Sequence, residues 1–150
     1  MGSLAPQGGG AGGGGGGGGG ATEQTIVSSQ DEAFVLSQTF ANALVIDLQT
    51  IKDNVFQIFN TSGSTALEYK IFASPKVQVS VPADADDSWR NVLNGRTDDP
   101  ADYDHALVRT IPVNGQQTES LDNAFAWARI QIRAITGSPS IKVYHRGVVP

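Results

Sequence analysis

The strongest constraint on the fold is an alternation of apolar and polar residues with a period of two. In residues 124–135 one face carries Ala126, Ala128, Ile130 and Ile132, and the other carries Trp127, Arg129, Gln131 and Arg133. Successive side chains of a β-strand point to opposite faces, so this segment is predicted to be a strand with one dry face. Similar alternation and regularly spaced turn residues are typical of an all-β sandwich or barrel.

These patterns predict an all-β protein, an antiparallel β-sandwich of jelly-roll-like topology with about eight strands. The strands are expected at residues 34–37, 43–48, 55–60, 67–71, 76–81, 106–113, 124–135 and 141–145. Residues 41–59 also fit a helical stripe, so a helix is an alternative there. Two strands are favoured because Val, Ile and Phe prefer strands and Asp53-Asn54 suits a turn. Residues 87–93 fit either a helical turn or a strand.

The amino-terminal segment differs abruptly in composition from the rest of the chain. Of the 18 glycines, 13 lie within the first 20 positions. Glycine has no side chain to bury and loses more backbone entropy on ordering than any other residue. We therefore divide the chain into a Gly-rich arm, residues 1–21, and a single β-sandwich domain, residues 22–150. The arm is expected to be disordered on its own or ordered by a partner.

Length and composition exclude several classes of protein. About 130 residues can bury one core without metal or disulfides, so a two-domain enzyme is excluded. The absence of cysteine excludes thiol catalysis and Cys-ligated zinc. A net charge of −5 argues against nucleic acid or an anionic membrane as partner. Because no signal-peptide pattern is present, we expect synthesis in the cytoplasm without a cleaved signal peptide.

Acidic residues concentrate in one stretch, which contains seven of the 15 in the chain. They are Asp84, Asp86, Asp87, Asp98, Asp99, Asp102 and Asp104. Calcium takes six to eight oxygen ligands, so these carboxylates are calcium candidates. Their spacing does not fit an EF-hand, and Arg90 and Arg96 lie among them. Solvated loops are therefore the preferred interpretation, an acidic docking surface is a further alternative, and no cofactor is expected.

No catalytic signature is present. The two histidines, His105 and His145, are not part of a His-Glu-x-x-His or similar metal cluster. The sequence Gly63-Ser64-Thr65 does not match a nucleophile elbow, and no phosphate-binding glycine loop follows a strand. We expect a protein that is not an enzyme. A hydrolase using His105 with nearby aspartates is the enzymatic alternative.

Aromatic and basic residues supply the candidate binding surfaces. A carbohydrate-binding module would use side chains such as Trp89, Trp127, Tyr69, Tyr103 and Tyr144. Packing in a core or a subunit interface is the favoured role for these aromatics, because aromatic side chains dominate buried area in both places.

The second predicted face of residues 124–135 is a candidate subunit interface. It carries an aromatic ring with guanidinium groups, which are enriched where proteins meet, so Trp127, Arg129 and Arg133 are predicted contacts. A cover formed by the arm or a loop is the alternative for this face. In the arm, Gly12, Gly16 and Gly20 would allow close approach of a neighbour's backbone.

Several segments together resemble small β-sandwich structural proteins of bacteriophage particles, of the capsid-decoration or tail-surface type. The resemblance covers residues 25–147 and rests on residues 67–74, Asp87-Ser88-Trp89 with Val92-Leu93, residues 123–132, and residues 142–145. The Gly-rich arm departs from this class. The resemblance implies a non-enzymatic role in a repeating assembly and carries over no site residue.

The hypothesis from the sequence is therefore a structural protein that self-associates or docks on a virion capsid, a tail surface or a similar extracellular assembly. Its expected partners are copies of itself, as a homo-oligomer, or a major structural protein of the same assembly. The arm is expected to make the inter-subunit contacts. The alternative is a carbohydrate- or surface-binding β-sandwich module with Trp89, Trp127 or Tyr103 exposed.

Overall fold

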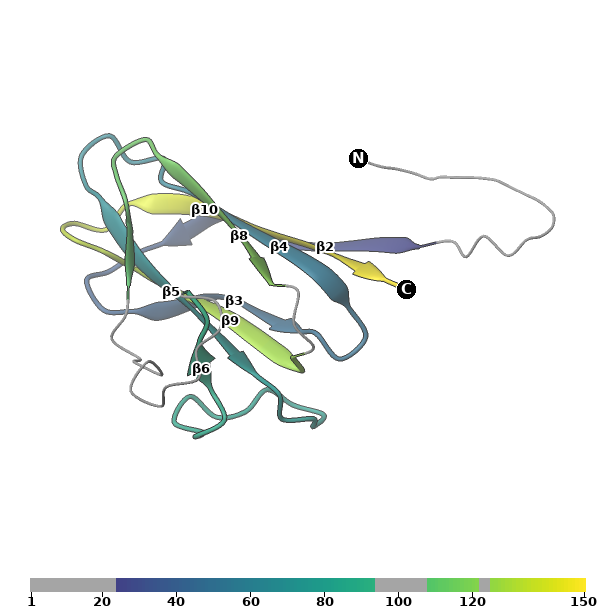
Figure 1. The fold of residues 1–150 in the computed structure, drawn as a ribbon. Helices are drawn as coiled ribbons and strands as arrows, with labels where there is room; N and C mark the ends of the chain where they lie inside the picture. Colours follow the sequence, from purple (N-terminus) through teal and green to yellow (C-terminus); the bar gives the residue numbers. More distant parts are fainter. Residues whose placement is uncertain (1–23, 94–107, 122–124) are drawn as a thin grey trace, which may run out of the picture.

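The computed structural model describes residues 24–93, 108–121 and 125–150, which form two antiparallel sheets packed face to face (Figure 1). The strands are β2 (Thr25–Val35), β3 (Ala41–Asp47), β4 (Lys52–Phe59), β5 (Leu67–Ser74), β6 (Arg90–Asn91), β7 (Arg109–Ile111), β8 (Gln116–Leu121), β9 (Trp127–Ala134) and β10 (Ser140–Val149). No helix occurs in these described ranges. The predicted all-β class is confirmed.

The order of the strands is that of a jelly roll. The first sheet runs β2-β10-β4-β8 and the second runs β3-β9-β5-β6, with β7 also paired to β5. Strand β9 pairs with one side of β5, and the short strands β6 and β7 both pair with its other side. Strands β6 and β7 thus occupy a single position in the sheet, so the nine strands correspond to the eight strands of a jelly roll. The pairs β2/β10, β3/β9, β4/β8 and β5/β6–β7 are nested, as in a double-sheet jelly roll. The predicted sandwich of about eight strands is confirmed.

The core lies between the two sheets and is filled by the inward side chains of both. From the second sheet come Tyr69, Ile130 and Ile132, and from the first come Phe56 and Val143, each at most 1% exposed. Ala128, Ile130 and Ile132 occupy the buried face that the alternation of residues 124–135 predicts. In each sheet the apolar side chains of the alternating strands thus face the other sheet and form the core.

Residues 41–59 form β3 and β4, so the helical alternative is wrong. The register of β3 against β9 shifts between Asn42 and Leu44. An extra residue of this kind interrupts the strict alternation, so the buried residues Ala43 and Ile46 lie three positions apart. That spacing is also the spacing of a helical stripe, which explains the ambiguity in the sequence.

Other segments differ from the sequence prediction. The strand expected at residues 76–81 is a loop. It cannot extend the pairing of β5, because β9 occupies one side of that strand and β6 and β7 occupy the other. Strand β2 begins well before the predicted residue 34, and β8 was not predicted because its residues are mostly polar. Residues 87–93 include the short strand β6.

Candidate functional site

One outer face of the sandwich is covered by the chain itself. Residues 75–89, here called the cover loop, follow β5 and lead to β6 (Figure 1). Trp89, at the end of this loop, lies against the outer face of the second sheet, in one cluster with Phe72 and Trp127. The Trp89 side chain is fully buried with Phe72, Ala126 and Trp127. Its Nε1 donates a hydrogen bond to the carbonyl oxygen of Ala83 at 2.9 Å, which anchors the ring within the cover loop.

Arg129 connects the cover loop to the sheet below it. Its guanidinium lies over the rings of Trp89 and Phe72, 4.3 Å and 5.0 Å from their centroids. Nη1 donates to Asp84 Oδ1 of the cover loop at 2.6 Å. Burial lowers the pKa of Arg129, and the charge of Asp84 opposes that shift. The arrangement combines cation–π contact with an ion pair and fixes the cover loop in place.

The structure places the predicted interface residues in different surroundings. Trp127 and Arg129 are 7% and 4% exposed, because the cover loop lies over them. Arg133 is partly exposed, forms an ion pair with Glu68 at 2.6 Å and lies over the ring of Phe40. Cover by a loop, the alternative from the sequence, is what the structure has at Trp127 and Arg129. A contact of these residues with another subunit stays a prediction.

The other predicted interface residues, Gly12, Gly16 and Gly20, lie outside the described residues. Their proposed part in subunit contacts also stays a prediction.

The aromatic residues considered for sugar binding are mostly buried. Trp89 and Tyr69 are fully buried and Trp127 is nearly so. The alternative in which Trp89 or Trp127 forms an exposed aromatic platform is therefore wrong, because both side chains pack beneath or within the cover loop. Tyr103 lies outside the described residues, and Tyr144 is half-buried on the outer face of the first sheet.

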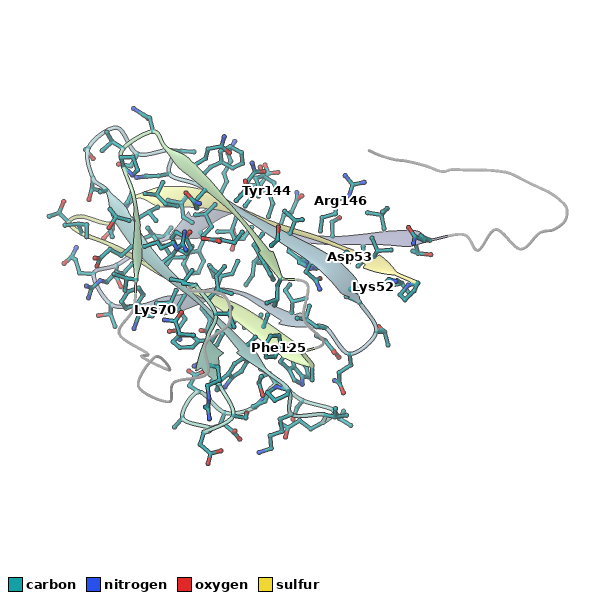
Figure 2. The ribbon with its side chains drawn as sticks, viewed as in Figure 1. Lys52, Asp53, Lys70, Phe125, Tyr144 and Arg146 are labelled. Carbon is teal, nitrogen blue, oxygen red and sulfur yellow. The ribbon has the colours of Figure 1, made fainter. Side chains whose placement is uncertain are left out.

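The outer face of the first sheet carries no cover from the described part of the chain. We call the surface of β2, β10 and β4 on this side the bare face; it holds a shallow groove of about 760 Å³. Ile26, Val148 and Val55 supply apolar side chains from three adjacent strands. Arg146 is paired in register with Val55 and stands beside them. Figure 2 shows Tyr144 and Arg146 along this sheet, with Asp53 nearby.

A polar pair lies directly beneath the bare face. His145 Nε2 is 2.7 Å from Asn54 Oδ1, and because that oxygen accepts, Nε2 carries the proton. His145 packs against Phe56, and Nδ1 has no hydrogen-bond partner among the described residues. Burial lowers the pKa of His145. The imidazole is thus a neutral core group that donates to an amide. His105 lies outside the described residues.

A second cluster of polar side chains joins the two sheets at their edge, and no local sequence pattern indicates it. The hydroxyl of Tyr69 on β5 donates to Glu119 on β8, and Arg109 on β7 approaches Glu119 at 3.6 Å. Burial, followed by the nearby Glu119, raises the pKa of Tyr69 above its usual value. Tyr69 is therefore a hydrogen-bond donor at all physiological pH values, and the group fastens one sheet to the other.

The calcium candidates are only partly within the described residues. Asp84 pairs with Arg129 and Asp86 with Lys76, both at 2.6 Å, and Asp87 is exposed. The remaining candidates, Asp98, Asp99, Asp102 and Asp104, lie outside those residues. No group of three potential metal ligands occurs where the structure is described. Calcium binding stays an untested alternative.

The chain matches no protein-family model and no curated protein sequence. Among solved structures, it is similar to that of the Bacillus endospore appendages, which form a novel family of disulfide-linked pili. The identity is 10%, the match covers 86% of this chain and 93% of that one, and the TM-score is 0.44.

A second similar structure is the SPBc2 prophage-derived protein YomS. Its identity to this chain is 15%, the match covers 85% of this chain and 96% of that one, and the TM-score is 0.47. Within the described residues, the structure contains no helix capable of spanning a membrane. At these identities the similarities concern the fold alone.

Proposed function

We propose that this protein is a non-enzymatic structural subunit of a repeating assembly, such as a virion capsid, a tail surface or another extracellular structure. Copies of the chain, or a major structural protein of the same assembly, are its partners, and the Gly-rich arm contacts neighbouring subunits. The observation that carries the proposal is the position of β2. This strand is an edge of the first sheet, and it begins directly after the arm.

Strand β2 is a long edge strand with one side unpaired. It has 11 residues and pairs with β10 along one side, while no described strand pairs with its other side. Natural edge strands are commonly short or protected by lysine, proline or bulges. Strand β2 contains neither lysine nor proline, but its register against β10 shifts between Asp31 and Phe34, beside the charged residues Asp31 and Glu32. A neighbouring subunit that approaches this edge also comes within reach of the arm.

The arm suits this role because of its composition. Nine consecutive glycines at positions 12–20 allow another backbone to approach closely, and every peptide group remains available for hydrogen bonds. A single flexible arm binds weakly because ordering it costs entropy. Many copies in one assembly supply the missing affinity through avidity.

The test compares the full chain with a chain that starts at Thr22, using light scattering at matched concentrations. We expect the full chain to form a large assembly that is lost on truncation, while circular dichroism shows the same β-rich fold in both. In the assembly, the arm is expected to resist proteolysis. If both chains have the mass of a monomer at every concentration, self-assembly through the arm is wrong.

A further inference from the structure

The unpaired edge of β2 differs in length from the other sheet edges of the molecule. The first sheet ends at β2 and β8, and the second ends at β3 and at the short strands β6 and β7. Strand β2 has 11 residues, whereas β8 has six, β3 has seven, and β6 and β7 have two and three. An unpaired edge presents backbone N–H and C=O groups that can pair with another strand. Within the described part of the chain, β2 therefore offers the longest edge for such pairing.

The first half of β2 is the part best suited to accept another strand. Residues 25–31 pair one for one with residues 143–149 of β10, and the register shifts only between Asp31 and Phe34. The first six residues of β2, 25–30, carry no charge, and the two acidic residues follow directly. Bulges and charged side chains are the features by which natural edge strands avoid pairing. Both features lie in the second half of β2, so the first half remains available.

The position of the charges indicates that a second copy of β2 fits this edge. In two antiparallel β2 strands related by a two-fold axis at Ser28, residues at equal distances on either side of Ser28 lie opposite each other. Asp31 then faces the uncharged Thr25 of the second copy. An axis at Asp31 or Glu32 would instead place two carboxylates directly opposite each other, which is destabilising. The other opposite pairs around Ser28 are Val27 with Ser29 and Ile26 with Gln30.

The position of the Gly-rich arm agrees with the same arrangement. The arm precedes β2 in the chain, so in an antiparallel pair each arm leaves beside the second half of the other copy's β2. That half ends at Val35, whose side chain is 62% exposed. Stable complexes bury about 1,200–2,000 Å², and one pair of short strands is a small interface beside that area. Contact between each arm and its neighbour would enlarge the interface.

We propose that two copies of this chain pair antiparallel through the unpaired edges of β2, around a two-fold axis at Ser28. The four-stranded first sheets of the two copies then form one continuous sheet. The contact is isologous, because the same residues supply both sides, and it closes on itself. Growth beyond a pair is left to the arms. This inference rests on the proposed function and names the surface on which each arm meets its neighbour.

The first experiment is disulfide cross-linking of the full chain, which has no cysteine of its own. The Ser28→Cys substitution places a thiol at the proposed axis, opposite its equivalent in the second copy. Directly opposite residues of antiparallel strands have Cβ atoms about 4.5–5.5 Å apart, close to the separation in a disulfide.

Gln30→Cys is the matched control for the cross-linking. Gln30 is exposed on the same strand and the same face as Ser28. In the proposed pair, however, the two copies of this residue lie four positions apart along the strands, about 13 Å. Under mild oxidation we expect Ser28→Cys to form covalent dimers roughly tenfold faster than Gln30→Cys. Equal rates, or a faster rate for Gln30→Cys, would overturn the proposed pairing.

A charge at Ser28 tests the contact without a covalent bond. Ser28→Lys places two ammonium groups opposite each other at the axis, where like charges are destabilising. The matched control is Ser120→Lys, because Ser120 is an exposed serine on β8, the other edge of the same sheet. Both variants change exposed side chains, so their circular dichroism spectra should match that of the unchanged chain. By analytical ultracentrifugation, we expect Ser28→Lys to weaken pairing roughly tenfold and Ser120→Lys to change it less than about twofold.

The outcomes separate this contact from the role of the arm. If the full chain forms only pairs, which Ser28→Lys weakens and truncation at Thr22 leaves intact, the edge contact stands and the role of the arm is wrong. If Ser28→Lys associates as strongly as the unchanged chain while truncation abolishes association, the edge contact is wrong and the role of the arm stands. If the full chain is a monomer at every concentration, both proposals are wrong.

Discussion

The two outer faces of the sandwich differ in how far the chain itself covers them. On the second sheet, the cover loop buries the outward side chains Trp127 and Arg129 at one end of β9, while Gln131 and Arg133 farther along stay partly exposed. On the first sheet, β10 alternates between buried and more exposed residues as far as Val148, and its outward residues Tyr144 and Arg146 reach the bare face. The second sheet is therefore packed on part of its outer side, whereas the first is packed only on its inner side.

The alternation of apolar and polar residues therefore identifies a strand, but it does not indicate whether solvent, another subunit or a loop covers the polar side chains. Trp and Arg can lie in water, in an interface or beneath a loop of the same chain. Arg129 is buried because Trp89 and Asp84, which lie about 40 residues earlier in the sequence, contact its guanidinium. The following predictions test how far the two faces differ.

Removal of the Trp89 ring is expected to have the largest effect. The Trp89→Ala substitution deletes the centre of the apolar cluster and uncovers Phe72 and Arg129. Large-to-small substitutions of buried aromatic residues cost about 3–5 kcal/mol. Urea unfolding monitored by circular dichroism measures the loss. A cost below about 1 kcal/mol would contradict the tight packing of the cover loop on the second sheet.

Addition of a methyl group at Gly147 tests the inner side of the bare sheet. A Cβ at this position would lie 2.4 Å from Ile51 Cγ2 and 2.6 Å from Asn54 Oδ1. Gly147→Ala is therefore expected to destabilise the fold by about 1–3 kcal/mol through overpacking. The matched control is Gly63→Ala, where the nearest atom would be 3.8 Å away. Equal unfolding midpoints for both variants would show that the β4–β10 contact is loose.

Neutralisation of Asp84 tests the link between the cover loop and the sheet. Asp84→Asn removes the charge that faces the buried guanidinium of Arg129. The Asp84 side chain is 76% exposed, so solvent weakens the pair and the expected cost is about 1 kcal/mol. Asp87→Asn, in the same loop, is the control and should change the free energy of unfolding less. A reversed order would contradict the assigned role of Asp84.

Much of the fold follows from local sequence pattern, because strand alternation is a local property. The pattern predicts the inward residues of β9 and the two strands of residues 41–59. It fails at Val77 and Val79, where the same alternation occurs in a loop and both sides of the preceding strand β5 are already paired. Whether a strand-like segment finds a partner depends on the complete topology.

The candidate sites were less predictable for the same reason. Tyr69 and Glu119 are 50 residues apart, and only the nested pairing of strands brings them together. The bare face also has no local signature, because Ile26, Val55 and Val148 come from three separate strands. The sequence did indicate that Trp127 and Arg129 are unusual, but their partner is the chain's own loop.

Acid is expected to weaken the sheet beneath the bare face through His145. Burial lowers the pKa of His145 in the folded state, so the unfolded chain binds a proton more readily. The stabilising contribution is complete above the unfolded pKa of about 6.5 and is lost as the pH falls toward the folded pKa. Unfolding free energies measured from pH 7.5 to pH 5 should therefore decrease.

His145→Gln is the control for this pH dependence. It removes the titrating ring while its amide can still donate to Asn54, so the pH dependence should become flatter. Asp86, whose pKa Lys76 holds below its usual value, titrates in more acidic solution and does not interfere. An equally steep dependence in the glutamine variant would assign the acid sensitivity to other groups.

The smallest effect is expected on the bare face itself. Val55→Thr changes an outward valine of β4, whereas Val143→Thr makes the same change at a fully buried valine of the neighbouring strand β10. At low protein concentration, Val55→Thr should change the unfolding free energy by less than about 0.5 kcal/mol. Val143→Thr should cost about 1–3 kcal/mol, because it buries a hydroxyl. Equal losses of unfolding free energy in the two variants would show that Val55 is buried and that the outer face of the first sheet is covered.

The costs of Val55→Thr and Val143→Thr in unfolding free energy, measured at several protein concentrations, distinguish a solvent-exposed face from one that a second copy covers. A ligand that binds only the folded state stabilises it in proportion to the logarithm of its concentration. If a second copy occupies the groove, the cost of Val55→Thr should grow as the concentration of the full chain rises, while that of Val143→Thr changes less. A constant difference between the two would mean that the groove stays empty at those concentrations.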